Sequence, residues 1–78
     1  MSAPNEAVKE SVDFGNGRVK YTGFRLDGEM HGAWSWYRTD RSLMRTGEFD
    51  RGRQIGTWKT FDREGSVVKE TRFSEYRT

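Results

Sequence analysis

Two stretches of this chain share one arrangement of glycine and aromatic residues, displaced by 24 positions. The first is GEMHGAWSWY, from Gly28 to Tyr37, and the second is GRQIGTWKTF, from Gly52 to Phe61. Both read G-x-x-x-G-x-W-x-x-(Tyr/Phe), so two glycines, one tryptophan and one further aromatic residue keep the same spacing. Self-similarity at a fixed period is the signature of repeat architectures. The chain is therefore expected to fold from one small unit used more than once.

The same period extends beyond these two stretches. Over three passes the aligned residues are Gly17, Arg41 and Gly65 at turns and Val19, Leu43 and Val67 at strand starts. Two full units, residues 17–40 and 41–64, are thus flanked by a partial unit on each side. Because Arg41 stands where the other two passes have glycine, we expect its turn to be longer or of another type.

Short runs rich in β-branched and aromatic residues separate these turns and predict strands. We expect strands at 19–26, 33–37, 43–49, 57–61 and 67–73, with Asn16-Gly17 and Asp27-Gly28 as tight turns. Connections of about four to five residues join only antiparallel neighbours, and no segment holds a helical spacing of apolar residues. The sequence predicts an all-β, single-layer antiparallel meander of about five to six strands, built from 24-residue β-hairpin repeats. The repeat domain is expected at 12–73, between a flexible tail at 1–11 and a second tail at 74–78.

Alternation along a strand assigns the aromatic residues to faces. Trp34 and Trp36 share one face of their strand, while Tyr37 belongs to the other. Trp58 is expected to lie on the same face as Trp34, so that the two stack at successive repeats. Tyr37 and Phe61 are expected to do the same on the opposite side, or to wedge between hairpins at the strand ends.

Composition limits what such a chain can be. Its 78 residues suffice for one small domain, and a mean hydropathy of −1.02 leaves an aromatic content of 14% to supply the core. With no cysteine there is no disulfide, thiolate metal site or thiol nucleophile, which fits a cytoplasmic location. The sequence has no apolar run long enough to span a membrane, so we expect a protein that is not transmembrane.

These residues resemble a known family. The Gly-x-x-x-Gly-x-Trp-x-x-(Tyr/Phe) pattern is followed by an (Asp/Glu)-Gly-like turn and by a strand that reads (aliphatic)-x-x-x-Gly. Together they are similar to the MORN-repeat variant of bacterial proteins of the YwqK antitoxin type. The resemblance covers about residues 17–73. Its clearest matches are Gly28, His31, Gly32, Trp34 and Tyr37 in one unit, Gly52, Gly56, Trp58 and Phe61 in the next, and Gly65 with Val67 at the start of a third. It implies successive β-hairpins in an elongated, curved sheet that serves as an interaction scaffold, in some relatives associated with lipid.

The sequence argues against an enzyme or a cofactor protein. The single histidine, His31, is expected in a hairpin turn, and the acidic residues lie mainly in turns, where they usually bind local backbone. Catalysis needs a base held by a partner, or paired carboxylates in a pocket. A metal ion would have to bind His31 with Asp27 or Glu29, which is a weak set of ligands, and we expect no catalytic residue, no metal site and no cofactor.

Aromatic residues are the best candidates for binding, although most of them are expected to form the core. The partner-binding candidates are Trp36, Trp34, Trp58, Tyr21, Tyr37 and His31, with Gly28, Gly32, Gly52, Gly56, Phe61 and Gly65 as structural residues of the repeat. Trp36 comes first because Thr60 takes its place in the next unit. An aromatic face left open would take another protein, so we expect a protein–protein interaction module, antitoxin-like by resemblance.

Two further kinds of partner remain as alternatives, a second copy of this chain and a polyanion. A meander has two unpaired edges, through which a homodimer would complete the burial that 78 residues barely supply. The alternative function is binding of polyanions, nucleic acid or anionic phospholipid, through Arg-rich turns and exposed aromatics. Its basic candidates are Arg38 and Arg41 at one end of the hairpins and Arg51 and Arg53 at the other. Because 12 acidic residues are interleaved with 14 basic ones, we rank nucleic acid and lipid below protein.

Overall fold

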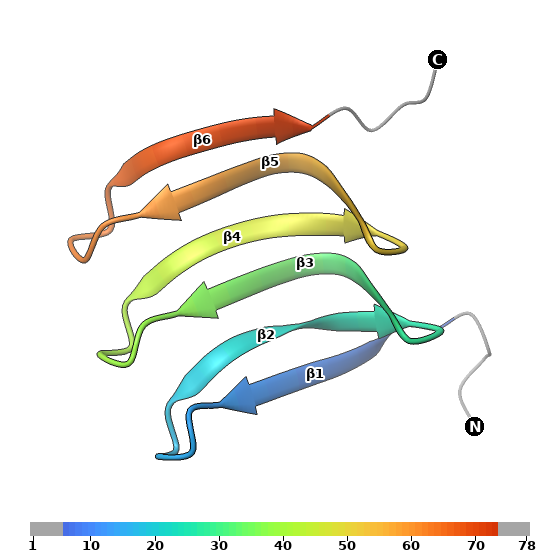
Figure 1. The fold of residues 1–78 in the computed structure, drawn as a ribbon, viewed down its shortest axis with the longest axis horizontal. Helices are drawn as coiled ribbons and strands as arrows, with labels where there is room; N and C mark the ends of the chain where they lie inside the picture. Colours follow the sequence, from blue (N-terminus) through green and yellow to red (C-terminus); the bar gives the residue numbers. More distant parts are fainter. Residues whose placement is uncertain (1–5, 74–78) are drawn as a thin grey trace.

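The computed structural model describes residues 6–73, which form one antiparallel sheet of six strands in chain order (Figure 1). The strands are β1 (Val8–Asp13), β2 (Val19–Leu26), β3 (Glu29–Tyr37), β4 (Leu43–Asp50), β5 (Arg53–Phe61) and β6 (Val67–Phe73). The principal extents are 37 × 35 × 13 Å, so the sheet is a single layer. The predicted all-β antiparallel meander is confirmed.

The N-terminal boundary needs a correction. Strand β1 begins at Val8, whereas the domain was expected to begin at residue 12 after a flexible tail. Residues 8–11 pair in register with β2, from Val8 opposite Arg25 to Ser11 opposite Thr22. Their polar composition hid them because an edge strand with few buried side chains shows little apolar alternation. The expected tail residues 1–5 and 74–78 lie outside the described residues.

Strands β3 and β5 begin four residues earlier than expected, at Glu29 and Arg53. The reason is that two-residue turns precede them. Asp27 and Gly28 have φ values of 52° and 84°, and Arg51 and Gly52 have 50° and 88°. Positive φ at both central residues is the type I′ geometry, which matches the twist of antiparallel strands and lets them pair from the first residue.

Three longer turns of equal length lie at the opposite end of the strands and connect β1 to β2, β3 to β4 and β5 to β6. Each is closed by a backbone bond from its first amide to its last carbonyl, between Phe14 and Arg18, Arg38 and Ser42, and Asp62 and Ser66, at 2.9 Å in each case. Arg41 adopts φ of 76°, close to 82° at Gly17 and 91° at Gly65. The expectation of a different turn at Arg41 was therefore wrong. Asn16 and Gly17, which were expected to form a tight turn, belong to the longer turn between Phe14 and Arg18. Asn16 does not have a positive φ, and its Oδ1 accepts a bond from the Arg18 amide at 3.0 Å.

The register of the sheet repeats with a shift of 24 residues. Tyr21 pairs with Trp36 between β2 and β3, and Arg45 pairs with Thr60 between β4 and β5. These two pairs shift register at equivalent places, between Thr22 and Phe24 and between Thr46 and Glu48. Each of the other three pairs contains a one-residue bulge, and these lie at Lys20, Met44 and Val68. Bulges bend and twist a sheet, and the strands curve together in Figure 1. Equivalent residues of successive units therefore occupy equivalent places.

Candidate functional site

One face of the sheet carries a continuous line of aromatic rings, here called the aromatic row. Its members are Tyr21, Trp34, Trp36, Phe49, Trp58 and Phe73. Trp34 and Trp58 do not stack directly on each other as expected. Instead Trp36 and Phe49 lie between them, with ring centroids 5.1–6.1 Å from both tryptophans. Trp34 and Trp58 are buried, 1% and 4% exposed, and anchor the row in the sheet.

Glycine lies beneath each of these two tryptophans. A Cβ placed on Gly23 would come within 2.0 Å of the Trp34 ring, and one on Gly47 within 2.2 Å of the Trp58 ring. Each indole thus lies flat on the glycine of the preceding strand. Both indole N–H groups are satisfied, since Trp34 donates to the Phe24 carbonyl and Trp58 to the Ile55 carbonyl, each at 3.1 Å. The two anchors are therefore fully paired structural elements.

Trp36, the first binding candidate, is half-buried within the row. It stacks on Trp34 at 6.1 Å and contacts Trp58 at 5.4 Å. The guanidinium of Arg45 lies 5.9 Å from its ring and 4.9 Å from that of Trp58. Trp36 therefore joins the two repeated tryptophans, and its outer surface forms part of the aromatic face. Tyr21 begins the row, 5.7 Å from Trp34.

Phe49 and Phe73 were not among the candidate site residues, although the structure places them in the row. Phe49 sits edge-on between Trp34 and Trp58, and Phe73 contacts Trp58 at 6.2 Å. Their separation of 24 residues was the available signal. Arg25 holds the same place one unit earlier, 5.6 Å over Trp34, while its Nε donates to Glu10 at 2.6 Å.

The aromatic row ends in an open groove at β5 and β6, which we call the row-end groove. It is lined by two aromatic residues, two cations and three uncharged polar residues: Trp58, Phe73, Arg45, Lys69, Gln54, Thr60 and Thr71. Its volume is about 360 Å³. The side chains of β6 are exposed except at Phe73, so solvent reaches the groove from the edge of the sheet. Two aromatic rings, two cations and the outer strand β6 therefore meet in this groove.

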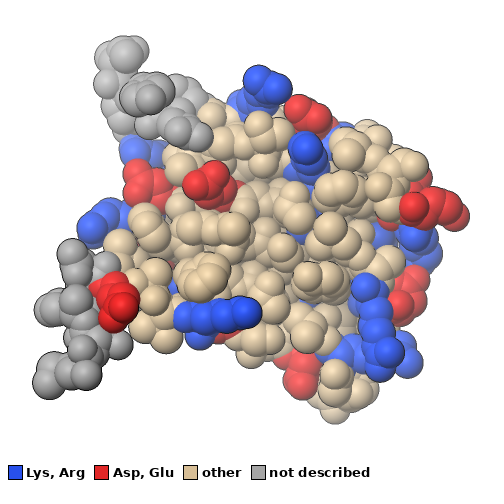
Figure 2. Space-filling view, turned by 180° about the vertical axis from the view of Figure 1, so that it is seen from behind, with Lys and Arg blue, Asp and Glu red and all other residues tan. Residues whose placement is uncertain are grey.

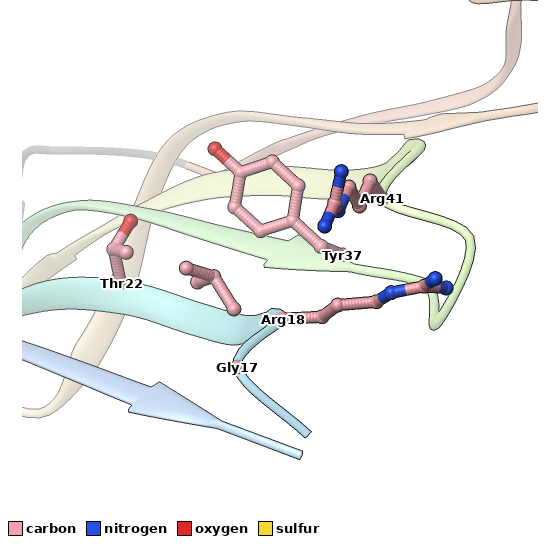
Figure 3. Close-up of a pocket in the computed structure, with 6 residues that line it drawn as sticks. Gly17, Arg18, Thr22, Tyr37 and Arg41 are labelled. Atoms are coloured by element: carbon pink, nitrogen blue, oxygen red, sulfur yellow. The ribbon is translucent and has the colours of Figure 1, made fainter. Parts of the chain in front are cut away.

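A second hollow of about 380 Å³ lies beside the long turns and contains Tyr37 (Figure 3). Its other lining residues are Gly17, Arg18, Val19, Thr22 and Arg41. Figure 3 shows the Tyr37 ring and the Thr22 side chain over the β2–β3 sheet surface, with Arg41 at its rim. Arg18 is not free, because its Nη1 donates to the Thr39 carbonyl at 2.7 Å. Tyr37 thus lies at a strand end, apart from the aromatic row.

His31 lies inside β3, not in the hairpin turn where it was expected. Its Nδ1 accepts a bond from the Arg51 amide at 3.2 Å and lies 3.8 Å from Asp50 Oδ1. The Gly52 amide of the same turn donates to the Met30 carbonyl at 2.8 Å. His31 therefore ties β3 to the neighbouring turn. Within residues 6–73, no group of three or more His, Asp or Glu residues is placed to hold a metal ion.

The four basic candidates do not form one site. The β3–β4 turn contains Arg38 and Arg41. It lies at the opposite end of the strands from the β4–β5 turn, which contains Arg51 and is followed by Arg53 at the start of β5 (Figure 1). Arg38 is part-buried and donates to the Ser42 hydroxyl and to the carbonyls of Leu43 and Phe61. The side chain of Arg53 lies 3.7 Å from Asp50. On the face in Figure 2, charges of both signs surround a centre of uncharged residues.

Comparisons with known protein families, curated proteins and solved structures returned no match to this chain. Among the helices and strands of the described residues there is no helix long and apolar enough to cross a membrane.

Proposed function

We propose that this protein is a non-enzymatic, cytoplasmic interaction module of the MORN-repeat variant type, which binds another protein through the aromatic row. Supporting this is the combination of a half-buried aromatic face and the row-end groove in a sheet one layer thick. Clusters of aromatic residues next to arginine are the usual energetic centres of protein interfaces. An antitoxin-like role, in which the bound protein is a toxin, is one form of this proposal and rests on the resemblance alone.

The experiment is capture of the partner from an extract of the source organism, followed by binding of the purified partner. Two variants each introduce the residue found 24 positions later. Trp36→Thr alters the aromatic face, and Ser35→Lys alters the opposite face of the same strand. We expect wild type and Ser35→Lys to bind alike and Trp36→Thr to bind at least tenfold more weakly. Equal binding by all three proteins would place the interface elsewhere and count against the proposal.

Polyanion binding is the alternative proposal, and Arg41 supports it most directly. Arg41 is exposed and lies at the rim of the hollow that contains Tyr37, where an anion would meet a guanidinium and an aromatic ring. Affinity for single-stranded DNA, or for anionic vesicles, would fall steeply with rising salt. Arg41→Gly removes the charge and retains a residue suited to the turn. Absence of binding at low salt contradicts the alternative and leaves the protein-binding proposal in place.

A further inference from the structure

The first two units of the aromatic row each have a tryptophan over a strand glycine, and the last unit has no tryptophan at the equivalent place. Gly23 lies under Trp34 of the next strand, and Gly47 lies under Trp58. The third residue of this series is Thr71, 24 positions after Gly47. Thr71 is exposed and lines the row-end groove. The register thus defines a place above Thr71 where the first two units each have an indole.

The strand that carries Thr71 is an edge. Within residues 6–73, strand β6 pairs only with β5, so no described strand pairs with the other side of its backbone. Its side chains are open as well, with Val67 and Val68 47% and 61% exposed. An unpaired strand edge is a template for a further strand, in which backbone bonds give affinity and alternate side chains give specificity.

We propose that a partner strand adds antiparallel to β6, with an aromatic ring over Thr71 and a carboxylate facing Lys69. This deepens the proposed function, on which it rests, because it names the site and the chemistry of the segment that is bound. The partner is an extended segment of a different protein with the pattern aromatic–x–acidic.

The pattern follows from the register of the earlier units. In the β4–β5 pair, Arg45 lies opposite Thr60, and the indole over Gly47 belongs to Trp58, two residues before Thr60. Lys69 is the residue 24 positions after Arg45. On the partner strand, the residue opposite Lys69 therefore comes two positions after the aromatic residue. Residues two apart share a face of a strand. Opposite charges directly across an antiparallel pair are favourable, so Lys69 selects an acidic side chain there.

Charge and register favour a foreign strand over a second copy of this chain. Strand β1 of a second copy would place Glu10, the residue equivalent to Trp34, over Thr71. That position calls for an aromatic ring, and Glu10 is already held by Arg25 at 2.6 Å. Two β6 strands paired with each other would each bring a Lys69 to the same face of the junction, which like charges disfavour.

The test uses the full chain and an acetylated, amidated eight-residue peptide of threonine and valine with Trp-Thr-Glu at its centre. Binding is followed by amide chemical shifts of the ¹⁵N-labelled protein. We expect shifts at β6 and in the row-end groove, and at least tenfold weaker binding when the peptide has alanine for tryptophan or lysine for glutamate. N-methylation of the peptide amides that face β6 should abolish binding, because strand addition needs them as donors.

A charge exchange makes the test specific to Lys69. Lys69→Glu should prefer the peptide with Trp-Thr-Lys by at least tenfold. Glu70→Lys is the matched control, because it reverses a charge on the same strand but on the opposite face, and it should keep the wild-type preference. Circular dichroism shows whether both variants keep the sheet. The proposal is overturned by equal binding of all peptides, by shifts away from β6, or by concentration-dependent dimerisation through β6. If no peptide binds while wild type still captures a protein through Trp36, this proposal fails and the proposed function stands.

Discussion

The indole of Trp34 occupies the space that a side chain at Gly23 would need. A Cβ there would lie 2.0 Å from Cδ2 of the ring, far inside van der Waals contact. Trp58 and Gly47 repeat this relationship in the next unit, at 2.2 Å. Glycine and tryptophan thus act as one structural element. The absent side chain on one strand is what allows the ring of the next strand to lie flat and be buried.

The first prediction tests this element with Gly47→Ala. The added methyl group cannot coexist with the buried Trp58 ring, so the ring or the strand must move. Overpacking of this kind costs about 1–3 kcal/mol, and we expect the free energy of unfolding to fall by about 2 kcal/mol. For a domain of this size that lowers Tm by roughly 10 °C. Thermal melts followed by circular dichroism measure the change.

Thr71→Ala is the matched control for Gly47→Ala. Thr71 stands at the equivalent position of the last unit, where the side chain is exposed and faces the row-end groove. Its replacement should change the free energy of unfolding by less than about 0.5 kcal/mol, as is usual for exposed sites. Similar losses in both variants would mean that the ring over glycine is not what makes the position sensitive.

The repeat spacing was enough to predict the strand order and the face shared by the three tryptophans. Trp34 and Trp58 recur at the same place in the pattern, and such recurrence indicates core. The role of Gly23 and Gly47 was not predicted, because a glycine in a strand indicates a bulge or a close approach without naming what approaches. Only the register brings each glycine beneath the tryptophan of the next strand.

Local reasoning failed where a contact comes from a distant part of the chain. His31 was placed in a turn because the strand was expected to begin only at Ala33, but its bond to the Arg51 amide joins β3 to the next hairpin. Arg41 was expected to change its turn, because arginine disfavours positive φ. The turn that contains Arg41 is linked to the next turn at that end of the strands, because Arg63 donates to Asp40, the residue before Arg41, at 2.7 Å. The row-end groove was not predicted, because it forms at Thr71, the position of the glycine series that no tryptophan covers.

The second prediction concerns Trp36→Thr, which gives this position the residue of the next unit. The change removes stacking on Trp34, contact with Trp58 and the cation contact with Arg45. Because Trp36 is only half-buried, we expect a loss of about 2 kcal/mol rather than the 3–5 kcal/mol of a fully buried tryptophan. Near-ultraviolet circular dichroism should lose intensity while the far-ultraviolet spectrum is kept. An unfolded variant would show that Trp36 is indispensable core.

The third prediction is that Arg41→Gly stabilises the protein. Arg41 is held at φ of 76°, a conformation that costs a residue with a Cβ about 1–2 kcal/mol. Glycine removes this cost but loses about 0.5–1 kcal/mol of chain entropy on folding, so the expected net gain is about 0.5 kcal/mol. Gly65→Ala at the equivalent position should lose about 1 kcal/mol. Chemical denaturation measures both, and a destabilised Arg41→Gly would show that the arginine side chain supports the turn.

The last prediction concerns pH and the exposed turn around Asp40. Bonds from the Ser42 hydroxyl at 2.6 Å and the Ser42 amide at 2.9 Å, with the Arg63 guanidinium, hold the pKa of Asp40 well below its usual range. A pKa lowered by folding means that the stabilisation is present above the ordinary value near 3.8 and is lost as pH falls below it. Asp40→Asn should therefore melt at a lower temperature than wild type at pH 7, and the difference should shrink between pH 4 and pH 2. Glu64→Gln removes a charge from the next turn and controls for net charge. A difference in Tm that stays constant down to pH 2 would contradict a role for the ionised carboxylate of Asp40.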